Sequence, residues 1–224
     1  MKKLIEKIYH HPIFYRIFPT TKYCLIKELK DCQSILDLGC GPSSPIQYVK
    51  NIRHSVGVEA FEPYILEAKK RNTHTKYIQK KIEGIDFPEK SFDAVILIEV
   101  LEHLPKERGY EILKKAEKWA KKKVIISTPN GFLLQLERDN NLLQKHLSGW
   151  GVDEMRKLGF RCNGLSGFKL LRQEAPAVIE ENDFMASIKM KPRFFWFIIA
   201  TLSQAYTYYF PKKAFEIFCV YNIK

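Results

Sequence analysis

Short apolar segments alternate with helical segments along the first two thirds of the chain. Strands are predicted at 34–38, 55–59, 75–79, 92–98 and 124–127. The run at 92–98 (FDAVILI) is almost continuously apolar, which is typical of a strand buried on both faces of a parallel sheet. Helices are predicted at 63–71, at 106–120 and from Ser44 onward. Because strands and helices alternate at this spacing, we predict an α/β fold, with a mostly parallel sheet and helices on both faces.

The last third of the chain is less regular. A helix is predicted at 150–158 and a strand at 160–168, and the β-rich segment 216–222 (EIFCVYN) predicts a final strand. We expect this last strand to pair antiparallel with 160–168. Residues 170–215 would then form an insertion within a hairpin.

An apolar helix is predicted at 193–210 within this insertion. It is too short and too interrupted for a membrane span, which needs about 20 apolar residues. Thr201, Gln204 and Thr207 form a narrow polar stripe at three-residue steps. Three explanations stay open: a core or oligomer helix, a lid over an apolar substrate, or a helix in a membrane interface.

Composition places the chain among folded proteins. We predict a single domain, residues 1–224, in which residues 1–30 form an N-terminal helical segment. Hydrophobic residues make up 46% and charged residues 28% of the 224. The net charge of +12 comes mainly from 1–30, 102–123 and 191–224 rather than from one site, so no nucleic-acid partner is expected. Solvated lysine faces or attraction of the two ends to an anionic surface explain this charge.

The five cysteines have no metal-ligand spacing, and their odd number argues against a disulfide framework. We therefore expect no metal site and a reducing compartment. The predicted location is the cytoplasm. Peripheral contact with the inner face of the membrane stays open.

A glycine-rich turn, Asp37–Ser43 (DLGCGPS), follows the first predicted strand. Glycine lets a ligand approach the backbone, and the following N–H groups can face an anion. Ser44 and Pro45 are suited to begin a helix as N-cap and first-turn residue. Glu59 ends the next strand, where a carboxylate can accept hydrogen bonds from a ribose. These features predict a nucleotide-type site, although Ser44 stands where the dinucleotide fingerprint has glycine.

Three segments in order resemble the motifs of class I S-adenosylmethionine-dependent methyltransferases, of the small-molecule type that includes the quinone-biosynthesis enzymes. They are 35–45 (ILDLGCGPSSP), 57–60 (GVEA) and 91–104 (SFDAVILIEVLEHL). The resemblance covers roughly 30–168. It implies a Rossmann-like seven-stranded sheet with an antiparallel last strand, S-adenosylmethionine as the cofactor, and methyl transfer to a small-molecule acceptor.

The resemblance also implies roles for individual residues. Asp37 would help to hold the amino group of the methionine moiety, and Gly39, Cys40 and Gly41 would line that moiety. Glu59 would bind the ribose hydroxyls, with Ala60 and Ile82 beside the adenine. Ile98 and Glu99 would close the pocket near the sulfonium. Two positions depart from the family pattern: Ser43 replaces a glycine, and Lys81 replaces an acid that Glu83 or Asp86 would have to supply.

The acceptor is expected to be a hydroxyl on an aromatic, lipid-linked or glycan-type molecule. Such an acceptor needs a base, and His146 is the first candidate, with His103 as the alternative. The other four histidines, His10, His11, His54 and His74, are expected to be solvated. Asn130 and Trp150 are predicted to contact the substrate. Leucines between 133 and 147 would wall an apolar cavity or belong to the core.

Two other classes of function are compatible with a chain of this kind. An RNA or protein methyltransferase is one, although the segment after 92–98 reads Ile98-Glu99-Val100-Leu101 and lacks the run that resembles amino-methyltransferases of nucleic acids. A non-catalytic module that docks on membrane or RNA is the other, and the intact cofactor motifs speak against it.

Overall fold

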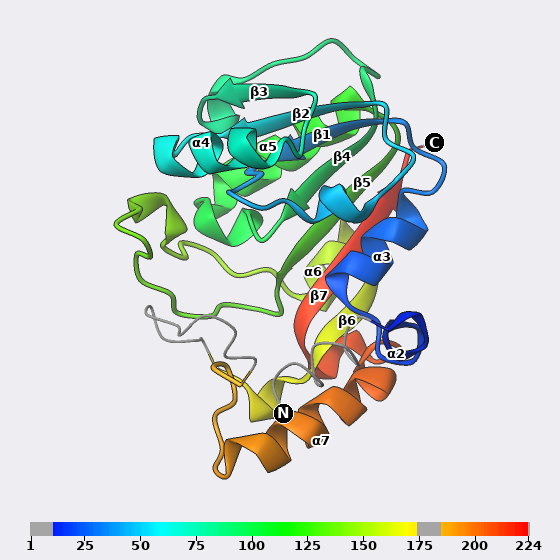
Figure 1. Ribbon diagram of the computed structural model, residues 1–224, viewed down its shortest axis with the longest axis vertical. Helices are drawn as coiled ribbons and strands as arrows, with labels where there is room; N and C mark the ends of the chain where they lie inside the picture. The colour runs from blue at the N-terminus through cyan, green and yellow to red at the C-terminus, as the bar shows by residue number, and fades with distance from the viewer. Residues whose placement is uncertain (1–10, 174–184, 224) are drawn as a thin grey trace.

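The computed structural model describes residues 11–173 and 185–223. Its centre is a seven-stranded sheet with the strand order β3-β2-β1-β4-β5-β7-β6 (Figure 1). The strands are β1 Ser34–Leu38, β2 His54–Glu59, β3 Lys76–Gln79, β4 Phe92–Ile98, β5 Ala120–Pro129, β6 Arg161–Phe168 and β7 Ala214–Asn222. Strands β1 to β5 pair in parallel, and β7 pairs antiparallel with both β5 and β6. The predicted fold class is confirmed.

Six described helices accompany the sheet: α2 Pro12–Ile17, α3 Thr21–Glu28, α4 Glu62–Arg71, α5 Lys106–Trp119, α6 Val152–Lys157 and α7 Arg193–Thr207. Alternate residues of β1 point to opposite faces, as the period of a strand requires. Leu36 and Leu38 pack with α5 and α6, whereas Ile35 packs with α3. Both faces of the sheet are therefore covered, which explains why its central strands are apolar throughout.

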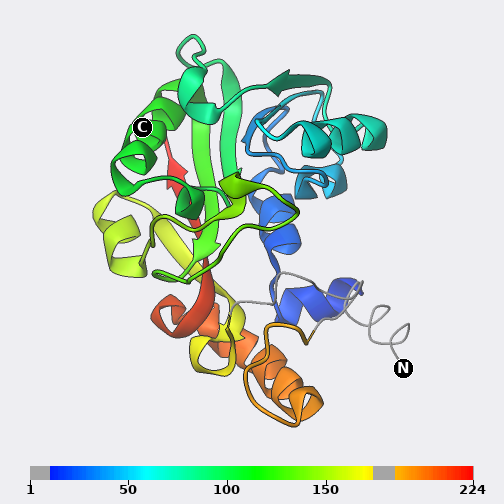
Figure 2. The ribbon, with the colours of Figure 1, turned by 90° about the vertical axis from the view of Figure 1, so that its left-hand side faces the viewer.

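The register of the strands brings several turns to one edge of the sheet. Leu38, the last residue of β1, lies opposite Val58 in β2 and Leu97 in β4, and Ile98 lies opposite Ser127 in β5. The segments that follow these residues therefore start side by side. The segment between β5 and α6 crosses the sheet on the side that faces the viewer in Figure 2.

The helix predicted from Ser44 is shorter than expected. Only a 3₁₀ helix, Pro45–Tyr48, forms there, although Ser44 Oγ does accept from Ile46 N at 3.3 Å as an N-cap. Val49 already has an extended backbone, with ψ of 111°. Asn51 then donates to the carbonyls of Leu29 and Cys32 at 2.9 and 2.5 Å, which ties the chain to the end of α3 before a longer helix can form.

Helix α7 lies at the end of β6, within the connection between β6 and β7 (Figure 1). Its polar stripe faces inward: Gln204 Nε2 donates to the Gly164 carbonyl at 3.0 Å, and Gln204 Oε1 accepts from Gly167 N at 2.7 Å. Its outer face is apolar and exposed. Phe197 and Ala200 are buried on the inner side as well, so apolar residues lie on both faces of this helix instead of on the core-facing side alone. Among the described residues, no helix has the length and apolarity to cross a bilayer.

Candidate active site

A cavity of about 550 Å³ opens at the edge of the sheet where β1, β2 and β4 end. Its volume lies within the range of about 300–1,000 Å³ that is usual for small-molecule sites. Every predicted cofactor residue except Asp37 lines it, from the glycine turn through Glu59 and Ile82 to Glu99. The cavity therefore brings together predicted cofactor residues from four separate stretches of the sequence.

The glycine turn needs glycine at two positions for different reasons. Gly39 and Gly41 have φ of +67° and +57°, a region that residues with a Cβ avoid. A Cβ on Gly39 would lie 2.7 Å from Cγ2 of Val100, whereas a Cβ on Gly41 would meet no atom within 4 Å. Gly39 and Cys40 also donate their N–H groups to the Val58 carbonyl at 2.8 and 3.0 Å. Gly39 is thus required for packing, and Gly41 keeps the cavity open.

Glu59 is fixed beside this turn by two backbone donors. Its Oε2 accepts from Gly41 N at 3.1 Å, and its Oε1 accepts from Phe61 N at 2.8 Å. The side chain is only 8% exposed, and burial raises its pKa, against the effect of these backbone donors. Each carboxylate oxygen has two lone pairs, so each can accept one further hydrogen bond. The carboxylate is therefore both oriented and able to bind a diol.

One of the two departures from the family pattern, Lys81, lies at the wall of the cavity. Lys81, Ile82 and Glu83 all line it, together with Ala60 and Tyr64. Asp86 does not, because its Oδ1 accepts from Trp119 Nε1 at 3.2 Å. Of the two replacement acids considered, Glu83 is the one at the cavity wall. Sequence reasoning missed Tyr64, whose hydroxyl donates to Asp139 Oδ2 at 2.5 Å and so ties α4 to the segment after β5.

Asp37 lies behind the turn rather than at the cavity wall. It accepts from Ser44 Oγ at 2.5 Å, and its Oδ2 lies 2.9 Å from His74 Nε2. His74 is 3% exposed, so the prediction that it is solvated was wrong. It occupies the space left by Gly57, where a Cβ would lie 3.0 Å from the imidazole. His10 lies outside the described residues, and His11 and His54 are exposed.

Glu99 follows β4 with φ of +55°, a rare conformation for a residue other than glycine that often marks functional sites. Part of the residue is exposed in the cavity, whereas its carboxyl group is turned inward and buried. Its Oε1 lies 2.7 Å from Ser127 Oγ, which also lies 2.5 Å from Glu216 Oε1. Burial and the nearby carboxyl of Glu216 raise the pKa of Glu99. The hydroxyl of Ser127 thus lies between the carboxyl groups of Glu99 and Glu216 and links β4 to β7.

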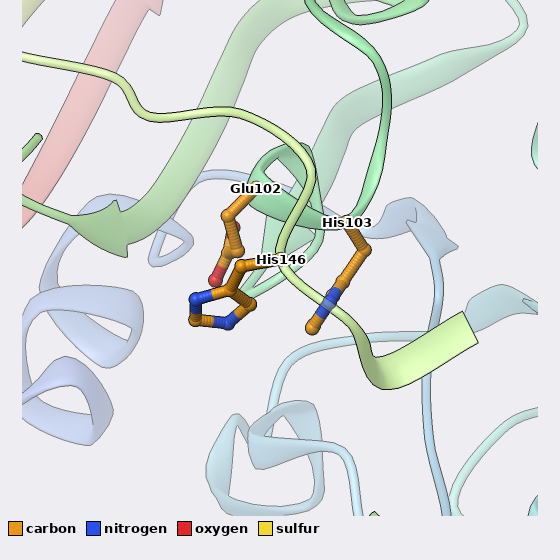
Figure 3. A group of neighbouring side chains, drawn as sticks. All are labelled: Glu102, His103 and His146. Carbon is orange, nitrogen blue, oxygen red and sulfur yellow. The ribbon is translucent and has the colours of Figure 1, made fainter. Parts of the chain in front are cut away.

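Both predicted base candidates lie together beside the cavity, with Glu102 (Figure 3). The rings of His103 and His146 are 4.9 Å apart, and His103 lines the cavity. Burial lowers the pKa of His103 to about 4 and also lowers the pKa of His146. Burial raises the pKa of Glu102 to about 7. Sequence reasoning missed Glu102, although it is next to His103 and three residues from Glu99 in one motif.

Asn130 and Trp150 have structural partners and do not line the cavity. The Asn130 amide donates to the carbonyls of Pro211 and Ala214 at 3.0 and 2.9 Å, which fastens the start of β7. Trp150 is fully buried, and its Nε1 donates to the Leu101 carbonyl at 3.2 Å. These contacts favour a scaffold role for both, and their predicted substrate contacts stay predictions.

The segment after β5 presents leucines at and around the cavity mouth. Leu143 and Leu147 line the cavity. Further apolar side chains of the same segment are exposed to solvent: Phe132, Leu134, Leu136 and Leu142, the last by 74%. The cavity therefore opens beside an apolar surface, which is uncommon unless a ligand or partner uses it.

Comparison with known proteins agrees with this geometry. Residues 36–127 match the family model described as a methyltransferase domain. (S)-coclaurine N-methyltransferase of Thalictrum flavum subsp. glaucum is 32% identical over 111 residues, which are 45% of this chain and 29% of that protein. Sterol 24-C-methyltransferase ERG6B of Gibberella zeae is 24% identical over 168 residues, which are 68% of this chain and 44% of that protein. The chain thus spans less than half the length of either curated relative.

Solved structures share the fold along nearly the whole chain. A SAM-dependent methyltransferase from Archaeoglobus fulgidus superposes with a TM-score of 0.53 at 17% identity, covering 94% of this chain and 98% of that one. The plantazolicin methyltransferase BpumL, in complex with SAH, gives a TM-score of 0.53 at 13% identity and covers 100% and 90%. The motif order, the strand order and the methyltransferase-domain match at residues 36–127 together show a chain with the Rossmann-like fold of class I S-adenosylmethionine-dependent methyltransferases.

Proposed function

We propose that this protein transfers a methyl group from S-adenosylmethionine to a small-molecule acceptor. The observation that carries the proposal is the placement of Glu59, held by Gly41 N and Phe61 N, beside a glycine turn that leaves open space at Gly41. A Cβ at Gly41 would fill the space that a bound cofactor needs. The residues present therefore fit this cofactor.

Each part of the cavity matches one part of the cofactor. Backbone at Gly39, Cys40 and Gly41 would line the methionine end, with Asp37 behind it, and Glu59 would accept from the ribose hydroxyls. Ala60 and Ile82 would flank the adenine, with Glu83 at the wall beside them. Ile98 and Glu99 would lie nearest the sulfonium.

S-adenosylmethionine supplies an electrophilic methyl group on a sulfonium, so the protein does not have to provide a nucleophile. The residues of this chain instead orient the two reactants and exclude water, and such positioning lowers the barrier of a bimolecular reaction. Leu143 and Leu147 at the cavity mouth are placed to exclude water from the transfer.

A base for the acceptor hydroxyl is proposed at His146, with His103 as the alternative. The Nδ1 atoms of His146 and His103 lie 2.7 and 3.3 Å from the carbonyls of Leu133 and Lys145. A carbonyl only accepts, so Nδ1 bears the proton and Nε2 has the free lone pair in each ring. Each histidine is replaced by alanine and single-turnover methylation is measured; unchanged rates in both variants exclude this role.

The proposed acceptor is apolar or lipid-linked, such as a prenylated aromatic compound. The exposed leucines beside the cavity mouth support this class, as does the sterol in the name of one relative. A glycan-type hydroxyl is the alternative, and an apolar cavity mouth favours it less.

The outer face of α7 supports contact with an anionic lipid surface. Phe194, Phe195, Ile198, Leu202 and Tyr206 follow one another along this face and are all exposed. Basic residues flank the helix at Lys191 and Lys213, so its charge complements anionic headgroups. Co-sedimentation with vesicles of anionic and of neutral lipid tests the contact; binding to neither kind rejects it.

Calorimetry with S-adenosylmethionine tests the proposed function most simply. We expect one cofactor molecule to bind each chain. If titration at micromolar to millimolar concentrations gives no heat and no rise in melting temperature, the proposal fails.

A further inference from the structure

We propose that Glu102, His103 and His146 bind a divalent first-row transition cation beside the cavity. One ligand atom from each of these side chains lies within 4.8 Å of the others. Ligand atoms at about 2.0–2.3 Å from one ion are separated by at most about 4.5 Å. A shift of a few tenths of an ångström therefore closes the cluster around an ion.

Glu102 gives independent support for a missing ligand. The residue is only 2% exposed, and within the described part of the chain its carboxylate oxygens make no hydrogen bond of good geometry, although the side chains of Thr128 and Glu99 lie beside them. Leaving a buried carboxylate without a partner is costly, and native structures rarely tolerate it. A cation between Glu102 and the two imidazoles supplies that partner.

Both imidazoles are oriented as metal ligands usually are. Each directs its Nδ1 at a backbone carbonyl, Lys145 for His103 and Leu133 for His146. Metal-binding histidines commonly donate one ring N–H to a carbonyl in this way, which fixes the ring and leaves the other nitrogen free to bind the ion. Two histidines with the same arrangement, one on each side of the cluster, are better explained by a common ligand than by packing alone.

The two segments that supply the ligands are fastened to each other. The Glu102 carbonyl accepts from Leu147 N at 2.7 Å and from Ser148 N at 3.0 Å. The Leu101 carbonyl accepts from Ser148 Oγ and from Trp150 Nε1, each at 3.2 Å. The residues before and after the ligands therefore cannot separate independently, and the site is organised before any ion binds.

The donor set indicates which ions fit. Two imidazoles and one carboxylate suit Mn²⁺, Fe²⁺, Co²⁺ or Zn²⁺, whereas Mg²⁺ and Ca²⁺ prefer oxygen ligands. Arg138 lies near both rings and opposes a cation, while the carboxyls of Glu99 and Glu216 lie near Glu102 and favour one.

Three protein ligands leave coordination positions open. His103 lines the cavity, so those positions are suited to an oxygen of water or of the acceptor. This use of the ion, unlike the binding itself, rests on the proposed function. An ion bound to both Nε2 atoms would use the lone pairs that the proposed base needs, so a metal-loaded site and the base role of His146 or His103 exclude each other.

The test uses the full-length protein, freed of metal with a chelator and then titrated with Mn²⁺ and, separately, Co²⁺. Electron paramagnetic resonance follows free Mn²⁺, and visible absorption follows bound Co²⁺. We expect one ion per chain, and a loss of affinity of at least about tenfold in His146→Ala and in Glu102→Gln. His54→Ala, an exposed histidine outside the cluster, is the matched control and is expected to bind like the wild type.

Absence of binding by the wild type, or equal affinity in wild type and Glu102→Gln, would overturn the site. The glutamine variant keeps the shape of Glu102, so it remains informative where His146→Ala fails to fold. The titrations contain no S-adenosylmethionine. If the wild-type protein binds the cofactor but no cation, only the metal site is contradicted. If it binds the cation but no cofactor, only the proposed function is contradicted.

Discussion

Replacing Glu59 by alanine is expected to abolish most of the affinity for the cofactor. The carboxylate of Glu59 lies at the cavity wall, where the backbone N–H groups of Gly41 and Phe61 hold it in place. A hydrogen bond to a charged group contributes about 1.5–3 kcal/mol, so the loss of two ribose contacts costs about 3 kcal/mol or more. At about 1.4 kcal/mol for each factor of ten, affinity falls roughly a hundredfold.

The assay is calorimetry with S-adenosylhomocysteine, which avoids turnover. Glu89→Ala is the control, because the carboxylate of Glu89 makes an exposed ion pair with Lys118 at 3.4 Å, and such pairs contribute little. Melting temperatures of both variants separate a loss of affinity from a loss of fold. The reasoning is refuted if folded Glu59→Ala binds within about threefold of the wild type, since about 0.7 kcal/mol is too little for two such bonds.

Three further predictions concern stability and surface contact. Gly39→Ala is expected to lower the free energy of unfolding by about 1–3 kcal/mol, because the new Cβ would collide with a methyl group of Val100. Gly41→Ala is expected to lose less stability but to bind the cofactor more weakly. Chemical denaturation measures the stability and calorimetry the binding, and equal effects of the two substitutions on both quantities would contradict this assignment. His74→Ala leaves Asp37 without one buried partner and is expected to cost about 1–3 kcal/mol in a urea titration, so an unchanged midpoint would count against it. Leu202→Ser, on the exposed face of α7, should leave the melting temperature unchanged and reduce binding to anionic vesicles, and undiminished binding would exclude this face.

The strands could be predicted from the sequence because a strand that is buried on both faces of a parallel sheet consists almost entirely of apolar residues. The segment 92–98 matches β4 residue for residue. The glycine turn could be placed for a similar local reason, since a positive φ and a close approach both require glycine. Signals of this kind depend only on neighbouring residues.

Other features depend on distant residues, and the sequence does not show them. His74 is buried because Gly57, 17 positions away in the chain, leaves room for its ring. The inward polar stripe of α7 depends on unpaired backbone groups of β6, which Gln204 satisfies. Hydropathy alone cannot orient this helix, because apolar residues lie on both of its faces, with Phe197 buried and Leu202 exposed.

The cluster at Glu102 could be predicted only in part. The pair Glu102-His103 lies within one motif, but His146 comes from a segment more than 40 residues later. Hydrogen bonds to the Glu102 and Leu101 carbonyls, from Leu147, Ser148 and Trp150, bring that segment into place. No local pattern encodes that contact.

The central claim is tested most directly by following the methyl group. Purified protein is incubated with S-adenosylmethionine labelled in its methyl group and with a lipid-plus-metabolite extract, and the labelled product is identified by mass spectrometry. We predict label in a small apolar molecule, and no label there when Glu59→Ala replaces the wild type. Label confined to RNA or protein, or no transfer at all by protein that binds the cofactor, would contradict this account.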